Sequence, residues 1–163
     1  MGAPMQRLIL FRHAKAERTS PTGEDFDRPL SPQGREDARL TGRALADAGY
    51  RPDLALVSAA RRTIQTWEAA AVAFPQARVE IIRNLFNADS DTLLDAARSH
   101  AERAETLMLV AHNPGAHELA SRLTTDARLD RGFPTSAAAV FELEAPDRYR
   151  LAALLGGEGG GAG

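Results

Sequence analysis

The 163-residue chain contains no cysteine. This absence excludes disulfide bridges, thiolate nucleophiles and cysteine-ligated metal sites. No apolar run approaches the roughly 20 residues that a membrane-spanning helix needs, and the first residues lack the long apolar stretch of a signal peptide. We therefore expect a cytoplasmic protein with no membrane partner.

The chain also lacks a large excess of charge of either sign. Its 20 lysines and arginines face 22 aspartates and glutamates, which gives a formal net charge of −2. A protein that binds nucleic acid through bulk electrostatics needs a strongly positive surface, so nucleic acid is not an expected partner. Any cationic site must be a local concentration of arginine.

Apolar strand-like runs alternate with helix-like stretches, which predicts an α/β protein. We expect a single domain over residues 1–155, built as a three-layer α/β/α sandwich around a mostly parallel central sheet. The Gly-rich residues 156–163 have nothing to bury, and this predicts a disordered tail. Helices are expected at about 31–49, 59–74, 90–101 and from 113 onward, a strand at 79–82, and a closing hairpin at 138–143 and 148–155. Asn113 is expected to cap the last helix.

Three apolar runs without polar alternation are typical of strands buried on both faces, and they lie at 8–11, 54–57 and 107–111. The first run ends in Arg12-His13, the second leads to Arg61, and the third ends in His112-Asn113. Parallel α/β sheets present ligand sites at the carboxyl ends of their strands. If these strands are neighbours, two imidazoles and several guanidiniums share one crevice, which suits a phosphoryl group.

Each signal has an ordinary alternative when taken alone. Arg12-His13 could be a solvated strand end, His112 a helix-capping imidazole, and Arg61 a surface residue in a first helical turn. The helix macrodipole disfavours a cation at that position, so Arg61 there indicates a nearby anion. The convergence of three strand ends favours the phosphate site.

No metal or cofactor is expected. His112 and His117 are five residues apart, which differs from the i, i+4 spacing of a helical zinc pair. No cluster of Asp, Glu and His appears elsewhere, and the glycine tail lacks the Lys-Ser/Thr ending of a P-loop.

Leu10-Phe11-Arg12-His13-Ala14 resembles the Arg-His signature of the histidine phosphatase (phosphoglycerate mutase-like) superfamily. Further stretches resemble the short bacterial SixA-type phosphohistidine phosphatases, and they lie at 27–34, 58–66, 110–114 and 133–136. The resemblance implies that His13 is the nucleophile and forms a phosphohistidine intermediate. The residues themselves leave open whether His13 or His112 attacks. The residues expected to bind the phosphoryl oxygens are Arg12, Arg28, Arg61, His112 and Asn113.

One position departs from the superfamily pattern. Many members place an acidic residue after the third strand to protonate the leaving oxygen, and this chain has Asn84 at the position judged equivalent. Asn cannot act as a general acid, although Asp89 or Asp91 could take that role. An imidazole leaves phosphohistidine more easily than an alkoxide leaves an ester. We therefore expect a preference for phosphoramidate-type or activated substrates.

The expected function is that of a metal-independent phosphatase whose phosphorylated substrate is phosphohistidine on a protein, for example a phosphotransfer protein. One alternative is a phosphatase for a small metabolite phosphoester. Another is a non-catalytic, phosphate-binding regulatory module, which the absence of an acid at Asn84 favours. Connections are short apart from 14–29, and a crevice left uncovered would admit a protein-borne group or a small molecule.

Overall fold

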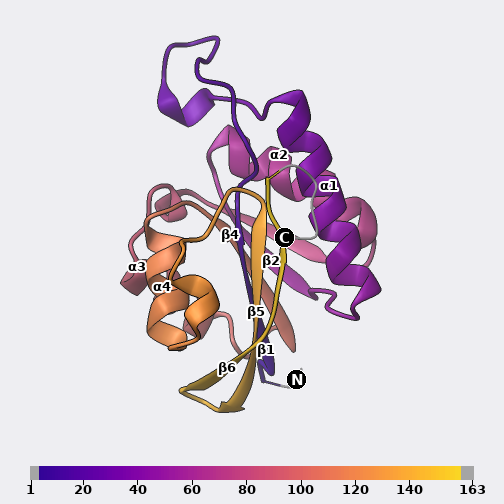
Figure 1. Cartoon of the computed structure of the whole chain (residues 1–163), viewed down its shortest axis with the longest axis vertical. Helices are drawn as coiled ribbons and strands as arrows, with labels where there is room; N and C mark the ends of the chain where they lie inside the picture. The colour runs from indigo at the N-terminus through magenta and orange to yellow at the C-terminus, as the bar shows by residue number, and fades with distance from the viewer. Residues whose placement is uncertain (1–3, 159–163) are drawn as a thin grey trace.

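The computed structural model describes residues 4–158, and a six-stranded sheet in the order β3-β2-β4-β1-β5-β6 lies at its centre (Figure 1). The strands are β1 (Arg7–Arg12), β2 (Leu54–Ser58), β3 (Arg78–Ile82), β4 (Thr106–Ala111), β5 (Ala137–Ala145) and β6 (Arg148–Gly156). The first four are parallel, β5 pairs antiparallel with β1, and β6 pairs antiparallel with β5. The mostly parallel sheet and the closing hairpin are confirmed.

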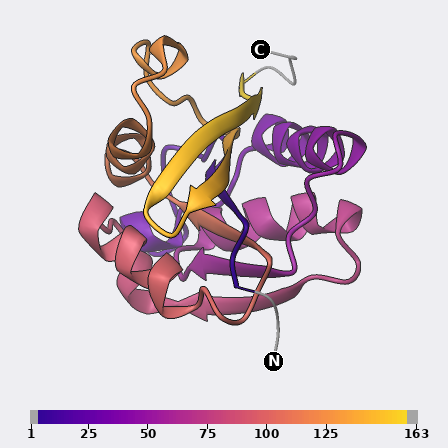
Figure 2. The ribbon, with the colours of Figure 1, turned by 90° about the horizontal axis from the view of Figure 1, so that it is seen from below.

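The four α-helices cover both faces of the sheet in pairs. They are α1 (Pro32–Asp47), α2 (Arg61–Ala70), α3 (Ser90–Ser99) and α4 (Gly115–Leu123). Figure 2 shows α1 and α2 on one side of the sheet and α3 and α4 on the other. The predicted three-layer α/β/α sandwich is confirmed. No helix within residues 4–158 is both long enough and apolar enough to cross a membrane.

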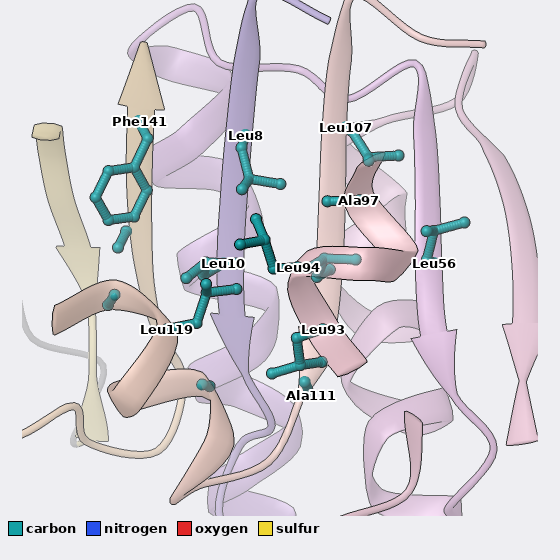
Figure 3. Close-up of a cluster of buried hydrophobic side chains, with 14 of the residues drawn as sticks. Leu8, Leu10, Leu56, Leu93, Leu94, Ala97, Leu107, Ala111, Leu119 and Phe141 are labelled. Atoms are coloured by element: carbon teal, nitrogen blue, oxygen red, sulfur yellow. The ribbon is translucent and has the colours of Figure 1, made fainter. Parts of the chain in front are cut away.

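Alternate side chains of the central strands enter two separate core layers. Leu8 and Leu10 of β1 pack with residues of α3 and α4, while Ile9 and Phe11 pack with residues of α1 and α2. In Figure 3, Leu93 of α3 is among the side chains that lie over this first face. Because both faces are buried, the strand carries apolar residues without polar alternation, as the sequence indicated.

Two segments differ from the sequence expectation. The residue at the N-cap position of α4 is Pro114, and no side chain caps that helix, so the prediction that Asn113 is the cap is wrong. Gly156 belongs to β6, and the N–H of Gly157 donates to Ser136 O at 3.1 Å, so the predicted disorder is wrong for these two residues. Residues 159–163 of the predicted tail lie outside the described residues.

The connection between β1 and α1 is the long loop that the sequence predicted, and it extends beyond the sheet at the top of Figure 1. Its two ends are held by neighbouring residues of α2. The N–H of Ala14 donates to Thr66 Oγ1 at 3.0 Å, and the N–H of Leu30 donates to Gln65 Oε1 at 2.7 Å. The loop therefore starts and ends at fixed points beside the carboxyl ends of the parallel strands.

Candidate active site

The pairing of β1 with β4 brings the two predicted histidines together. Arg12 lies opposite Ala111 in the parallel register, and the N–H of His13 donates to Ala111 O at 3.0 Å. His13 and His112 each follow the last residue of their strand, and their ring centroids are 5.3 Å apart. The sequence-based expectation that these two imidazoles lie together at the strand ends is confirmed.

The environment of His13 defines which ring nitrogen carries its proton. Nδ1 lies 2.7 Å from Ala14 O, and because a carbonyl oxygen can only accept, Nδ1 must be the donor. Burial is the largest influence on the ring and lowers the pKa of His13 to about 4. The Ala14 hydrogen bond opposes this change, while the charges of Arg62 and Arg12 add to it. At neutral pH, Nε2 therefore has a free lone pair and can act as a nucleophile.

His112 has the complementary arrangement. Its Nε2 lies 2.7 Å from Ser58 Oγ, and that hydroxyl also accepts from the N–H of Ala60 at 3.4 Å. When the Ser58 hydroxyl donates its hydrogen to Nε2, the ring proton of His112 lies on Nδ1. Burial, followed by the charges of His13 and Arg62, lowers the pKa of His112 to about 3. His112 is therefore a neutral N–H donor.

Two arginines add donors to the same crevice. Arg12 Nη1 donates to Phe133 O at 3.0 Å, and Arg62 donates to the backbone and carboxylate oxygens of Asp25 at 2.8 and 3.1 Å. The remaining nitrogens Arg12 Nε, Arg62 Nε and His112 Nδ1 are buried and have no hydrogen-bond partner. Buried N–H groups are seldom left unpaired, so this cluster indicates a site that can bind an oxyanion.

The arginine at the site is Arg62, and the prediction of Arg61 is wrong by one residue. Arg61 is exposed at the first position of α2 and forms no side-chain hydrogen bond or ion pair with the described residues, whereas only 4% of the Arg62 side chain is exposed. Consecutive helical residues point about 100° apart, so the helix start decides which of two adjacent arginines faces inward. The sequence predicted a helix that begins at about residue 59, and this start was not exact enough to show which arginine faces inward.

Arg28 of the loop acts on His13 through its charge, and it is paired with a residue that the sequence did not single out. Arg28 Nε donates to Asp25 Oδ1 at 2.9 Å, and Asp25 Oδ2 pairs with Arg62 at 3.1 Å. Partial burial alone would raise the pKa of Asp25, but hydrogen bonds and charge from Arg28 and Arg62 outweigh it, and the pKa is lowered. Asp25 thus fastens the loop to α2, and no periodicity or motif marks it.

One amide N–H of Asn113 is bonded to a backbone oxygen, and the role of Asn113 in binding phosphate stays a prediction. Its Nδ2 donates at 2.8 Å to Phe133 O, the same oxygen that accepts from Arg12. The N–H of Ser136 donates to the carbonyl oxygens of Arg12 and His13 at 3.2 and 3.0 Å. Residues 133–136 therefore support the end of β1, a role that the sequence resemblance did not specify.

An aromatic wall closes one side of the crevice. The ring of Phe86 meets that of His112 edge-on at 5.5 Å, and Phe26 of the loop meets Phe86 edge-on at 5.0 Å. Both rings limit the access of water to His112, which strengthens electrostatic interactions there. Within residues 4–158, no three His, Cys, Asp or Glu side chains are grouped as a metal ion would require.

Residues 8–103, more than half of the chain, match the histidine phosphatase superfamily (branch 1). The chain belongs to this superfamily. The enzyme class is that of a phosphatase.

Other proteins resemble this histidine phosphatase over most of its length. A candidate SixA phosphohistidine phosphatase of Agrobacterium tumefaciens is 34% identical, with a TM-score of 0.84 over 94% of this chain and 99% of that one. An uncharacterized chloroplastic protein of Arabidopsis thaliana is 30% identical over 92% of this chain and 77% of that protein. The tungstate complex of the protein histidine phosphatase SixA, 21% identical, shares the fold with a TM-score of 0.78 over 92% of this chain and 96% of that one.

The two adjacent arginines provide a matched pair of variants. Arg62→Ala removes a buried donor, and we expect kcat/KM for 4-nitrophenyl phosphate to fall by about 10²–10³. Arg61→Ala removes an exposed guanidinium and should leave kcat/KM near that of the unmodified enzyme. Equal losses in the two variants, with both still folded by circular dichroism, would contradict the placement of Arg62.

The neutral state of both histidines is testable without substrate. Since burial lowers the pKa of His13 to about 4 and that of His112 to about 3, neither ring should gain a proton between pH 7 and pH 5. Ring proton and nitrogen chemical shifts in the phosphate-free protein, assigned with His13→Ala and His112→Ala, should stay constant over that interval. A midpoint near pH 6.5 for either ring would show that it is solvated.

Proposed function

We propose that this phosphatase removes phosphoryl groups from phosphohistidine on a protein, through a covalent phosphohistidine at His13. The observation that carries the proposal is the unprotonated Nε2 of His13 beside buried nitrogens that have no hydrogen-bond partner, those of His112, Arg12 and Arg62. A transferring phosphoryl group spreads its charge over three oxygens, so positioning and donors account for most of its stabilisation.

In the first step, the lone pair of His13 Nε2 forms a bond to phosphorus as the bond from phosphorus to the substrate nitrogen breaks. Arg12, Arg62 and His112 Nδ1–H donate to the phosphoryl oxygens. The Nδ1–H of His13 stays bonded to Ala14 O, so phosphorylated His13 is a cationic ring that later leaves as neutral imidazole. In the second step, water bonds to phosphorus, the bond to Nε2 breaks, and the water proton passes to the phosphate product.

The carboxylates considered as general acids are held in other interactions. Asp89 caps α3, and hydrogen bonding to Thr92 lowers its pKa, which makes it a poor proton donor. Asp91 pairs with Arg122 at 2.6 Å, and Asn84 is exposed and cannot supply a proton. A phosphohistidine protonated on its other ring nitrogen leaves as neutral imidazole without an enzymatic acid. An alkyl ester has no such route.

The protein substrate is supported by two further observations. The A. tumefaciens protein that is 34% identical over nearly its whole length is itself described as a candidate phosphohistidine phosphatase. At this end of the sheet the connections after β2, β3 and β4 are short, whereas the β1–α1 loop and the α4–β5 connection (residues 124–136) are longer, so the expectation that only 14–29 is long is corrected. Short connections after three of the four parallel strands favour a substrate group that is carried on the surface of another protein.

The nucleophile can be identified by trapping. Incubation with a radioactive phosphoryl donor, followed by rapid denaturation, should give a label that is acid-labile and base-stable, as expected for phosphohistidine. The label should map to His13 and disappear in His13→Ala, whose activity should fall by about 10³ or more. His100→Gln, a substitution at the end of α3, should retain the label; labelling of His112 instead would overturn the assignment.

The substrate class can be tested with two peptides of one sequence, phosphorylated either on His or on a Ser in its place. Without a general acid, we expect kcat/KM for the phosphohistidine peptide to be higher by about 10²–10⁴. Phosphate release by the unmodified enzyme and by His13→Ala is the measurement. Comparable rates on both peptides would contradict the preference, and tight phosphate binding without turnover would identify a binding module.

A further inference from the structure

A second cavity adjoins the phosphoryl site and has no part in the mechanism above. Its volume is about 570 Å³. The side chains that define it are Arg12, Asn113, Arg128, Arg131, Phe133 and Leu154. Because Arg12 also supplies an unpaired donor to the phosphoryl crevice, a ligand in this cavity lies next to the group that is transferred.

The charged residues that line this cavity are all positive. Three arginines line it, and none of its lining residues is acidic. Arg128 is already neutralised by Asp126, to which it donates twice at 3.0 and 2.9 Å. Arg131 is exposed and forms no hydrogen bond or ion pair with the described residues. Among the arginines that line the cavity, Arg131 and Arg12 thus form no ion pair with the described residues.

Apart from Asn113, the rest of the lining is apolar, chiefly Phe133, Pro134 and Leu154. Ion pairs formed against apolar walls are stronger than those in open water, because the local dielectric is lower. An anion attached to an apolar carbon chain would pair with Arg131 and bury the chain on these walls. The chemistry that fits is an acidic group on a short aliphatic segment.

The chain itself places a carboxylate near this rim. The N–H of Gly157 is bonded to Ser136 O, so the residue that follows, Glu158, is held close to the end of β6. The negative charge of Glu158 acts on Arg12 and opposes the lowering of the Arg12 pKa by burial. A carboxylate of the chain is therefore already within electrostatic range of this group of arginines.

We propose that the cavity bounded by Arg12 and Arg131 is a subsite for a second acidic group of the substrate, carried on an aliphatic segment beside the phosphoryl group. The proposal deepens the proposed function and rests on it in one respect: the phosphoryl group must occupy the donors of Arg12, Arg62 and His112. On a protein substrate, the acidic group is a Glu or Asp side chain near the phosphohistidine. On a small molecule, it is a carboxylate of the same molecule.

Binding measurements test the subsite without requiring turnover. The probes are alkylphosphonates of several chain lengths, each ending in a carboxylate or in the uncharged amide of the same length. For at least one length, we expect calorimetry to give a Kd about tenfold lower for the carboxylate than for the amide. Arg131→Glu should abolish or reverse this ratio within the same variant.

Arg148→Glu is the matched control, because it makes the same change of charge at an exposed position at the opposite end of the β5–β6 hairpin. It should keep the carboxylate preference. Equal Kd values for all carboxylate and amide pairs in the unmodified protein would overturn the subsite. A preference that survives Arg131→Glu, or that Arg148→Glu removes equally, would overturn it as well.

The source of the acidic group is decided by turnover of phosphohistidine peptides that differ only in Glu or Gln beside the histidine. A higher kcat/KM for the Glu peptide, lost in Arg131→Glu, supports a protein segment in the subsite. If the phosphonate preference holds but the peptides show equal rates, the subsite belongs to a small-molecule substrate. If neither peptide is hydrolysed while 4-nitrophenyl phosphate is, the proposed protein substrate fails and the phosphonate result still decides the subsite.

Discussion

The parallel pairing of β1 with β4, with Arg12 opposite Ala111, sets the geometry on which the site depends. Both strands are buried on both faces, and their apolar side chains hold them in one register between the two helical layers. A shift by one residue would turn each strand side chain toward the opposite layer. Because the register is held in this way, the residue after each strand is held too, and these residues are the two histidines.

Burial has two effects on the side chains of this site. It lowers the pKa of His13 and His112, so both rings are neutral while positive guanidiniums lie beside them. It also deprives Arg12 and Arg62 of water at Nε, so their donors have no partner until an oxyanion enters. One environment thus keeps the nucleophile unprotonated and makes the crevice specific for negative charge.

The sequence predicted the parts of the site that follow from strand burial. Arg12, His13 and His112 lie at the ends of continuous apolar runs. Such runs can be recognised in the sequence without knowledge of the tertiary structure. The choice between Arg61 and Arg62 depended on the residue at which α2 begins. The residue at the N-cap position makes no side-chain hydrogen bond to the helix, so the sequence does not indicate that start clearly.

Interactions between distant segments were the part that the sequence could not show. Asp25 lies in an aperiodic loop, and its significance comes from a contact with α2 that spans 37 residues of chain. Asn113 had the residue type of a helix cap, but its amide pairs with Phe133 across 20 residues instead. In both cases a long-range partner outweighed the local preference of the residue.

The attachment of the β1–α1 loop at both ends to Gln65 and Thr66 has an evolutionary consequence. Chain added to the outer part of a loop whose ends are already fixed costs little extra closure entropy. Insertions or deletions in residues 18–24 would therefore change what reaches the rim of the crevice and leave the anchored base in place. Related enzymes could diversify their partners at this loop while they keep one reaction centre.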